Sequence, residues 1–479
     1  MLPLPLAGEG RGEGLPPEEP EKQTGTLLAR IQQGYGYRRR FHWLTPRRIR
    51  TLPDHSRKNE FVRMKQLVVI GGGVVGVTTA WALAEAGHRV TLVEREAALA
   101  TGASRANGGQ LSYRYVSPLA DAGVPLKALR WLLDPDGPLR FKPDGTWAQW
   151  RWLASFLAHC RGPVNRRTTE RLLELGAFSQ RCFADLQRHA ALDAIALRTP
   201  GKLVVYRKED EFARVAARLS ARGPERALTR EECLAIEPAL GDGGAQWLAG
   251  GIFTAGEAVA DCHALSVQLG ERLERHPNFE QRLQAQATGF SVDRGRVVAL
   301  KTDRGELGAD GVVLAAGLQS AALADQVGVR LPLYPLKGYS LSAPINGVHR
   351  PPTVSVTDFE RKTLYARIGG QLRVAAMVDL VGEDTRLDPH RLAALQRNVR
   401  ETFPRAADYD RAVPWAGLRP ATPSGAPMLG ETPLQGLWLN VGHGALGFTF
   451  SFGSARIVAD LVSGKPSPIP LDGLQLRTA

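Results

Sequence analysis

The clearest pattern along the chain is an apolar run that meets closely spaced glycines. Residues 67–70 read Leu-Val-Val-Ile, and residues 71–76 read Gly-Gly-Gly-Val-Val-Gly. A short continuous apolar run bounded by glycine is typical of a buried strand, and the Ala-rich segment 77–86 that follows has helical spacing. The sequence therefore predicts a strand, a tight glycine turn and a helix in immediate succession.

Strand and helix patterns continue to alternate downstream, as in α/β proteins. A hairpin is predicted around Arg294-Gly295, where two alternating runs flank a turn. Strands are also predicted at 89–94, 202–206, 311–317 and 437–441, helices at 170–189 and 446–462, and several short alternating strands within 331–377.

A chain of 479 residues exceeds the usual size of one domain, so we expect two domains. The pattern indicates a dinucleotide-binding α/β domain that is interrupted twice by a second, mainly antiparallel domain. The expected nucleotide-domain segments are 64–117, 246–330 and 413–465; the second-domain segments are 118–245, with a helical insertion, and 331–412; residues 466–479 form a tail.

The first 63 residues differ from the rest. They are rich in Pro, Gly and Arg and have no sustained helical or strand period, which is typical of disorder. Met64 stands directly before the first predicted strand. We therefore expect residues 1–63 to be a disordered extension, and we hypothesise that Met64 is the native start.

Charge and cysteine usage exclude several classes of protein. The net charge is +13, but Lys and Arg are dispersed among acidic residues, so we do not expect nucleic-acid binding. Four widely separated cysteines form no metal-binding pair, which argues against a metal site and for a reducing compartment. No continuous apolar run is long enough to predict a membrane-spanning helix, and peripheral attachment to a membrane stays open.

The glycines follow the G-x-G-x-x-G spacing of a dinucleotide site. Gly71 permits the tight turn, Gly73 lets the backbone approach a pyrophosphate, and Gly76 lets helix pack on strand. Glu94, at the end of the next apolar run, is placed to accept from a ribose hydroxyl and disfavours a 2′-phosphate. The expected contacts are Val68, Val69, Ile70, Gly71, Gly72, Gly73, Val74, Val75, Gly76 and Glu94.

Three later segments favour FAD over NAD. The small, polar loop 102–110 suits the ribityl chain and pyrophosphate of a flavin, and the strand ending at 316–317 can bring backbone against a cofactor. The loop 442–447 leads into a helix whose N-terminus can stabilise negative charge on a reduced flavin. The residues expected to contact FAD are Ser104, Asn107, Gly108, Gly109, Gln110, Ala316, Gly317, Gly442, His443, Gly444, Leu446 and Gly447.

Residues 64–465 resemble the FAD-dependent D-amino-acid oxidase and glycine oxidase family, and within it the small subunit of bacterial D-amino-acid dehydrogenase. The resemblance rests on segments 106–113 (Ala-Asn-Gly-Gly-Gln-Leu-Ser-Tyr), 117–119 (Ser-Pro-Leu), 124–129 (Val-Pro-Leu-Lys-Ala-Leu), 334–340 (Tyr-Pro-Leu-Lys-Gly-Tyr-Ser), 415–420 (Trp-Ala-Gly-Leu-Arg-Pro) and 439–447 (Leu-Asn-Val-Gly-His-Gly-Ala-Leu-Gly). Segment 373–377 and Phe448 depart from the family pattern.

This resemblance implies a glutathione-reductase-like FAD domain with an antiparallel substrate domain over the flavin. It implies oxidative deamination of D-amino acids, D-alanine among them, with non-covalent FAD and electrons passed to a quinone or other respiratory acceptor. We expect a cytoplasmic location, and peripheral attachment to the cytoplasmic face of the inner membrane stays open.

The resemblance also nominates substrate-binding residues. Arg419, before Pro in its motif, is expected to hold the substrate carboxylate through its two-armed guanidinium. Tyr365 is expected to give a second bond to the carboxylate, although a packing role on a half-buried strand is nearly as well supported. Tyr339 is a weaker candidate, and His443 is expected to act through its backbone.

Two other functions stay open at this point. One is an oxygen-using oxidase of glycine, sarcosine or another secondary amine. The other is a flavin-bearing subunit that relays electrons and has no substrate of its own, which the intact Arg419 motif argues against.

Overall fold

The computed structural model describes residues 63–121, 123–219 and 223–476. All but the last residue of the predicted disordered extension, residues 1–62, therefore lie outside the described residues. The first of two main sheets has the strand order β19-β20-β13-β1-β2-β9 and is parallel except for the β19–β20 pair. Its strands are β1 (Gln66–Ile70), β2 (Arg89–Val93), β9 (Phe279–Arg282), β13 (Gly311–Leu314), β19 (Met428–Glu431) and β20 (Leu437–Val441).

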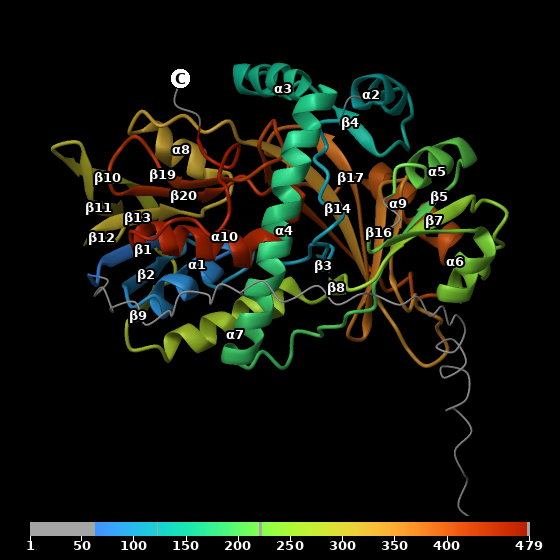
Figure 1. The fold of residues 1–479 in the computed structure, drawn as a ribbon, viewed down its shortest axis with the longest axis horizontal. Helices are drawn as coiled ribbons and strands as arrows, with labels where there is room; N and C mark the ends of the chain where they lie inside the picture. The colour runs from blue at the N-terminus through green and yellow to red at the C-terminus, as the bar shows by residue number, and fades with distance from the viewer. Residues whose placement is uncertain (1–62, 122, 220–222, 477–479) are drawn as a thin grey trace, which may run out of the picture. The chain divides into compact units, whose positions relative to one another are not determined.

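Layers on both faces bury this parallel sheet, as its unbroken apolar strands require. The helices of one face are α1 (Val74–Glu85), α7 (Cys262–Glu274) and α10 (Gly447–Val462), and α10 also packs on α4 (Gly162–Ala190) (Figure 1). The other face is covered by α8 (Gln319–Asp325) and by an antiparallel sheet of β10 (Ala287–Asp293), β11 (Arg296–Thr302) and β12 (Gly305–Gly308). The predicted Arg294-Gly295 hairpin joins β10 and β11, and both turn residues have positive φ.

The second main sheet has nine strands in the order β18-β14-β17-β16-β15-β5-β7-β6, with β4 paired to β17. Its strands are β4 (Leu139–Phe141), β5 (Lys202–Tyr206), β6 (Glu225–Leu228), β7 (Gly250–Thr254), β14 (Tyr334–Pro344), β15 (Ser355–Asp358), β16 (Thr363–Ile368), β17 (Gln371–Leu380) and β18 (Val413–Ala421).

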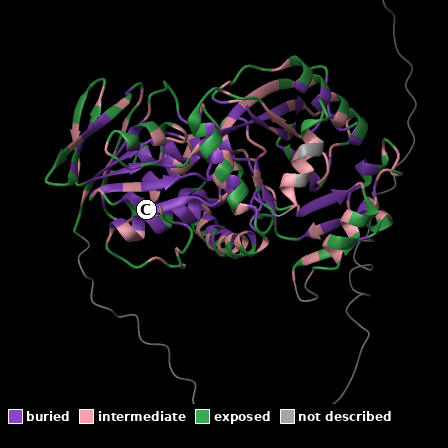
Figure 2. Cartoon of the chain, turned by 90° about the horizontal axis from the view of Figure 1, so that it is seen from above, coloured by how far each residue is buried: buried purple, intermediate pink, exposed green. Residues whose placement is uncertain are grey.

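One face of the nine-stranded sheet packs on a separate core. That core includes Leu341, Val374 and Phe403, with α6 (Arg230–Ile236) and α9 (Pro389–Thr402) covering it. The remaining elements are β3 (Gln110–Leu111), paired with β8 (Ala258–Val259), and the helices α2 (Val124–Leu132), α3 (Trp147–His159) and α5 (Glu209–Ala216). Buried residues concentrate on the strands of both main sheets (Figure 2).

The domain boundaries differ from those expected. β7 pairs with β5, and β18 pairs with β14, so both belong to the nine-stranded sheet rather than to the nucleotide domain. Helix α4 was expected in the second domain, yet it packs on α10 of the nucleotide domain. There the ring centroids of Phe183 and Phe452 lie 4.5 Å apart. The expected tail also packs on the nucleotide domain, because Leu474 is fully buried. Each boundary depends on pairing between segments far apart in sequence, which local patterns do not specify.

Within the described residues, one helical stretch, Gly444–Val462, is long and apolar enough to cross a membrane. Most of it is buried between α1 and α4. Its apolar character is therefore explained by its position in the protein core.

Candidate active site

A cavity of about 1540 Å³ separates the glycine turn of the first sheet from one face of the nine-stranded sheet. The nucleotide domain contributes the turn after β1, the loop 100–110, residues 315–319 and the loop 440–449. The nine-stranded sheet contributes Trp415, Ser340, Ala375, Leu364 and Thr357, which are consecutive register partners on five neighbouring strands. We call these five residues the cavity row.

The glycine turn is shaped to admit a dinucleotide. A Cβ on Gly76 would lie 1.7 Å from the carbonyl oxygen of Gly71, so only glycine permits this close crossing of helix and turn. Gly71 has a φ of +109°, and a Cβ there would meet the backbone of Ala315. By contrast, a Cβ on Gly73 would approach only Ser104 Oγ, at 3.4 Å, which leaves the start of α1 open to the cavity. Such a helix N-terminus binds phosphate oxygens.

Glu94 is held in place at the end of β2. Its carboxylate accepts from the backbone N–H of Gly72, at 2.5 Å, and from that of Glu96, at 2.9 Å. The side chain lines the cavity beside the glycine turn. The turn and Glu94 together fit the adenosine half of FAD, and the contact between Glu94 and the ribose stays a prediction.

Most of the residues predicted to bind the cofactor line this cavity. Val68 and Val69 do not, because their strand is covered on both faces and their side chains are buried in separate cores. Gly72 and Gly76 do not line the cavity either; their lack of a side chain permits the close packing of the turn. Those that line it are Ile70, Gly71, Gly73, Val74, Val75, Glu94, Ser104, Asn107, Gly108, Gly109, Gln110, Ala316, Gly317, Gly442, His443, Gly444, Leu446 and Gly447.

His443 is uncharged in its loop. The ring is buried, its Nε2 lies 3.1 Å from Ser454 Oγ, and burial lowers the pKa of His443 to about 3. A neutral imidazole tied to α10 fixes the loop, and the N-terminus of α10 follows at Gly447. We therefore assign the His443 side chain a structural role, and the backbone of its loop lines the cavity.

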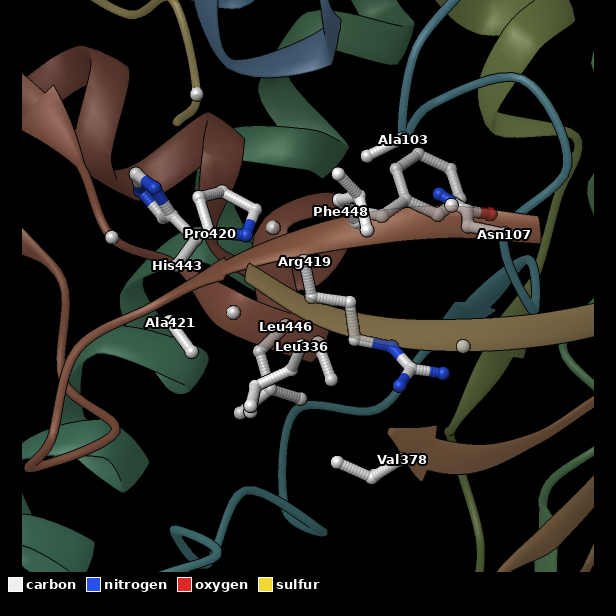
Figure 3. Close-up of a pocket in the computed structure, with 18 of the residues that line it drawn as sticks. Ala103, Asn107, Leu336, Val378, Arg419, Pro420, Ala421, His443, Leu446 and Phe448 are labelled. Atoms are coloured by element: carbon white, nitrogen blue, oxygen red, sulfur yellow. The ribbon is translucent and has the colours of Figure 1, made fainter. Parts of the chain in front are cut away.

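Arg419 extends from β18 into the cavity toward Val378 (Figure 3). Its Nη1 donates to the carbonyl oxygen of Met377 at 2.9 Å, and its other two nitrogens have no hydrogen-bond partner among the described residues. Burial lowers the pKa of Arg419 to about 10, so the guanidinium remains protonated near neutral pH. The arrangement leaves nitrogen donors free for a carboxylate.

A β-bulge turns the Met377 carbonyl toward Arg419. The β14–β17 register shifts between the pairs Lys337–Asp379 and Tyr339–Ala376, and Met377 has a φ of +66°. A side-chain-bearing residue rarely adopts this conformation, which costs about 1–3 kcal/mol where it is held. Sequence reasoning noted that segment 373–377 departs from the family pattern but did not predict the bulge.

The predicted substrate contact of Tyr365 is wrong, and the packing role weighed beside it is the one that the structure supports; the contact of Tyr339, which borders the cavity, stays a prediction. Side chains alternate across a strand, and Tyr339 and Tyr365 fall on the face opposite the cavity row. Tyr365 is fully buried against Phe403, at a ring-centroid distance of 4.9 Å, and does not line the cavity. Tyr339 borders the cavity, but its hydroxyl donates to Asp379 Oδ2 at 3.1 Å behind the sheet.

Several polar cavity residues were missed by the sequence reasoning. Ser340 Oγ and Thr357 Oγ1, both in the cavity row, are buried and have no hydrogen-bond partner in the described part of the chain. Lys202 Nζ donates to Gln110 Oε1 at 2.6 Å and to Ser112 Oγ at 3.1 Å, linking the sheet to the predicted flavin loop. Lys362, before β16, also lines the cavity. A polar residue at the buried position of an apolar strand is the signal that could have identified Lys202, Ser340 and Thr357.

Comparison with curated proteins finds close relatives over most of the chain. It is 49% identical over 415 residues to D-amino acid dehydrogenase 2 of Pseudomonas aeruginosa, covering 87% of this chain and 99% of that protein. It is 43% identical over 415 residues to D-amino acid dehydrogenase of Paramagnetospirillum magneticum, covering 85% and 97%.

Comparison with solved structures supports the fold. Glycine oxidase from Geobacillus kaustophilus superposes with a TM-score of 0.68 at 23% identity, covering 87% of this chain and 99% of that one. The family model for DAO, the FAD-dependent oxidoreductases, matches residues 66–461, which include both main sheets and the cavity. The chain therefore belongs to the DAO family of FAD-dependent oxidoreductases.

Proposed function

We propose that the protein catalyses the FAD-dependent oxidative deamination of D-amino acids to 2-oxo acids and ammonia. The observation that carries the proposal is the Arg419 guanidinium, which faces the cavity with free donors opposite the flavin loops. The names of relatives up to 49% identical support the D-amino-acid class. Bound FAD supplies the acceptor for the hydride that leaves the substrate Cα.

The residues of this chain orient the substrate. Arg419 binds the carboxylate, and the Met377 carbonyl holds the guanidinium in its working direction. The cavity row forms the floor below the substrate, and its Ser340 and Thr357 hydroxyls are the polar groups there. Fixing the carboxylate in this way aims the Cα–H bond and supplies much of the rate enhancement through positioning. An amine that arrives neutral needs no strong base.

The released imino acid reacts with water to give the 2-oxo acid and ammonia. This step consumes one water and needs no further oxidant. The two electrons removed from the substrate must then leave the flavin for an acceptor. We propose a quinone as that acceptor and the cytoplasmic face of the inner membrane as the place of transfer, in keeping with the dehydrogenase names of the relatives.

The test is anaerobic addition of D-alanine to the purified, FAD-loaded full chain while the flavin spectrum is recorded. Loss of the oxidised flavin absorbance with D-alanine, and none with L-alanine, is the expected result. A flavin that stays oxidised with every D-amino acid would overturn the proposal. Reoxidation by a soluble quinone faster than by oxygen is expected for the acceptor, and the reverse order would favour an oxidase.

A further inference from the structure

We propose that this site prefers D-amino acids that carry a second carboxylate, of the length of D-glutamate, and that Lys362 binds that second carboxylate. The inference rests on the proposed function, since Arg419 must hold the α-carboxylate. Lys362 lies between β15 and β16 and lines the same cavity as Arg419.

The sheet order sets the spacing of the strands next to the two cations. Lys362 directly precedes β16, which pairs with β17, and β17 pairs with β14. The guanidinium of Arg419 lies over Gly338 on β14. The backbones of Lys362 and Gly338 therefore belong to positions two strand spacings apart, on the order of 10 Å, and the Lys362 Nζ extends from there over the ring of Phe359.

This separation matches an acidic amino acid. The two carboxylate carbons of an extended D-glutamate are about 5 Å apart, as ordinary covalent geometry dictates. Each ion pair adds roughly 3 Å between nitrogen and oxygen. A molecule of this length can therefore span Arg419 and Lys362, whereas D-alanine has nothing to offer the lysine.

The charged groups around Lys362 are only partly paired with one another. Lys127 and three carboxylates lie near it; Glu211 and Asp358 are paired with other cations, whereas Glu360 Oε1 has no hydrogen-bond partner among the described residues. Glu211 pairs with Lys127 at 2.8 Å and with Arg214 at 3.0 Å; Asp358 pairs with Arg207 at 2.7 Å; Glu360 accepts from the backbone N–H of Arg207 at 3.0 Å. Lys362 itself has no ion pair with any described residue.

Lys362 is bordered by aromatic rings instead. Its Nζ lies 3.7 Å from the ring centroid of Phe359 and 5.9 Å from that of Trp131, and Phe359 in turn packs on Tyr206. Lys362 and these three aromatic residues, Phe359, Trp131 and Tyr206, all line the cavity. Burial, together with the neighbouring Lys127, lowers the pKa of Lys362 to about 8. A substrate carboxylate beside Lys362 stabilises the charged form of this lysine. Binding of a substrate with a side-chain carboxylate is therefore favoured over binding of one with a neutral side chain.

The test compares D-glutamate with D-glutamine, which is nearly the same shape and lacks the charge. In anaerobic flavin reduction, we expect kcat/KM to favour D-glutamate by at least about tenfold, the effect of one partly buried ion pair. Lys362→Met should remove this preference mainly through the KM for D-glutamate, and Lys362→Arg should retain it. Lys301→Met, an exposed lysine on β11, is the matched control and should change neither substrate.

Equal kcat/KM values for D-glutamate and D-glutamine in the wild type would overturn the inference. Equal losses of kcat/KM for the two substrates in Lys362→Met, with FAD content unchanged, would also overturn it. Reduction by D-alanine without a preference for D-glutamate overturns this inference and leaves the proposed function standing. Reduction by no D-amino acid at all overturns the proposed function as well.

Discussion

The guanidinium of Arg419 rests directly on Gly338, and no other residue would leave it room. A Cβ on Gly338 would lie 2.1 Å from Nη2 and 2.3 Å from the guanidinium carbon of Arg419. The two residues come from the paired strands β18 and β14. The glycine therefore determines where the proposed carboxylate-binding group lies in the cavity.

Gly338→Ala is expected to displace Arg419 and to raise the KM for D-alanine by about tenfold or more, since a small misplacement of a positioning group is costly. FAD content should stay normal, because the flavin loops are untouched. Steady-state kinetics with an artificial acceptor measure the effect. An unchanged KM would show that Arg419 can bind the carboxylate from another position.

Arg419→Lys removes the two-armed geometry while keeping the charge. We expect the KM for D-amino acids to rise by about tenfold or more, because an ammonium is no substitute at a bidentate site. The bond to the Met377 carbonyl can be re-formed, so thermal stability should change little. A KM equal to that of the wild type would remove Arg419 from the substrate site.

Asp379→Asn is expected to lower the free energy of unfolding by about 3–5 kcal/mol, the usual result of breaking a buried ion pair. Asp379 is fully buried and pairs with Arg391 at 2.7 Å and with Arg140 at 2.8 Å. Urea unfolding of the FAD-loaded protein measures the loss. The exposed Asp472, 3.4 Å from Arg171, is the matched control, and Asp472→Asn should change stability little. Similar losses of unfolding free energy in Asp379→Asn and Asp472→Asn would contradict a stabilising role for the buried ion pairs of Asp379.

Gly76→Ala is expected to abolish FAD binding, because its Cβ would lie 1.7 Å from the Gly71 carbonyl oxygen and force the turn open. The ratio of flavin to protein absorbance after purification measures the loss. Gly308→Ala, at a glycine with open space around its Cβ, should bind FAD normally. Full flavin content in Gly76→Ala would mean that the turn can tolerate the displacement.

The preference for D-glutamate over D-glutamine should depend on pH through Lys362. Burial lowers its pKa to about 8, so the lysine is a cation below this pH and loses its charge above it. We therefore expect the ratio of the two kcat/KM values to be highest below about pH 8 and to fall as the pH rises through it, since kcat/KM reports the free enzyme. Ionisation of the α-amine affects both substrates, and the same ratio measured with Lys362→Met shows how much it contributes. A ratio that stays constant from pH 6 to 10 would exclude Lys362 as the source.

The glycine turn was predictable because its chemistry is local. Gly71, Gly73 and Gly76 act within one strand–turn–helix unit, so their spacing alone specifies the shape that the structure shows. The position of Arg419 in the cavity was likewise predictable from a short motif, although its contact with Met377 was not.

The orientation of the tyrosines was not predictable. Tyr339 and Tyr365 lie on strands where a one-residue change of register exchanges the two faces, and the bulge at Met377 shifts that register. Lys362 was missed because a lysine in a turn is normally solvated. Lys362 directly precedes β16, and only the pairing of β16 with β15 and β17 places this turn beside the cavity.

The interleaving of the two main sheets has a consequence for the way the protein folds. β5 and β7 precede α7, while β14 and β18 follow β13, so each sheet is completed only by segments on both sides of strands that belong to the other. Neither sheet corresponds to a continuous stretch of chain that could be expressed or exchanged alone. The wall that carries Arg419 and the wall that carries the glycine turn are therefore built from alternating stretches of one chain, and recombination between relatives must keep both.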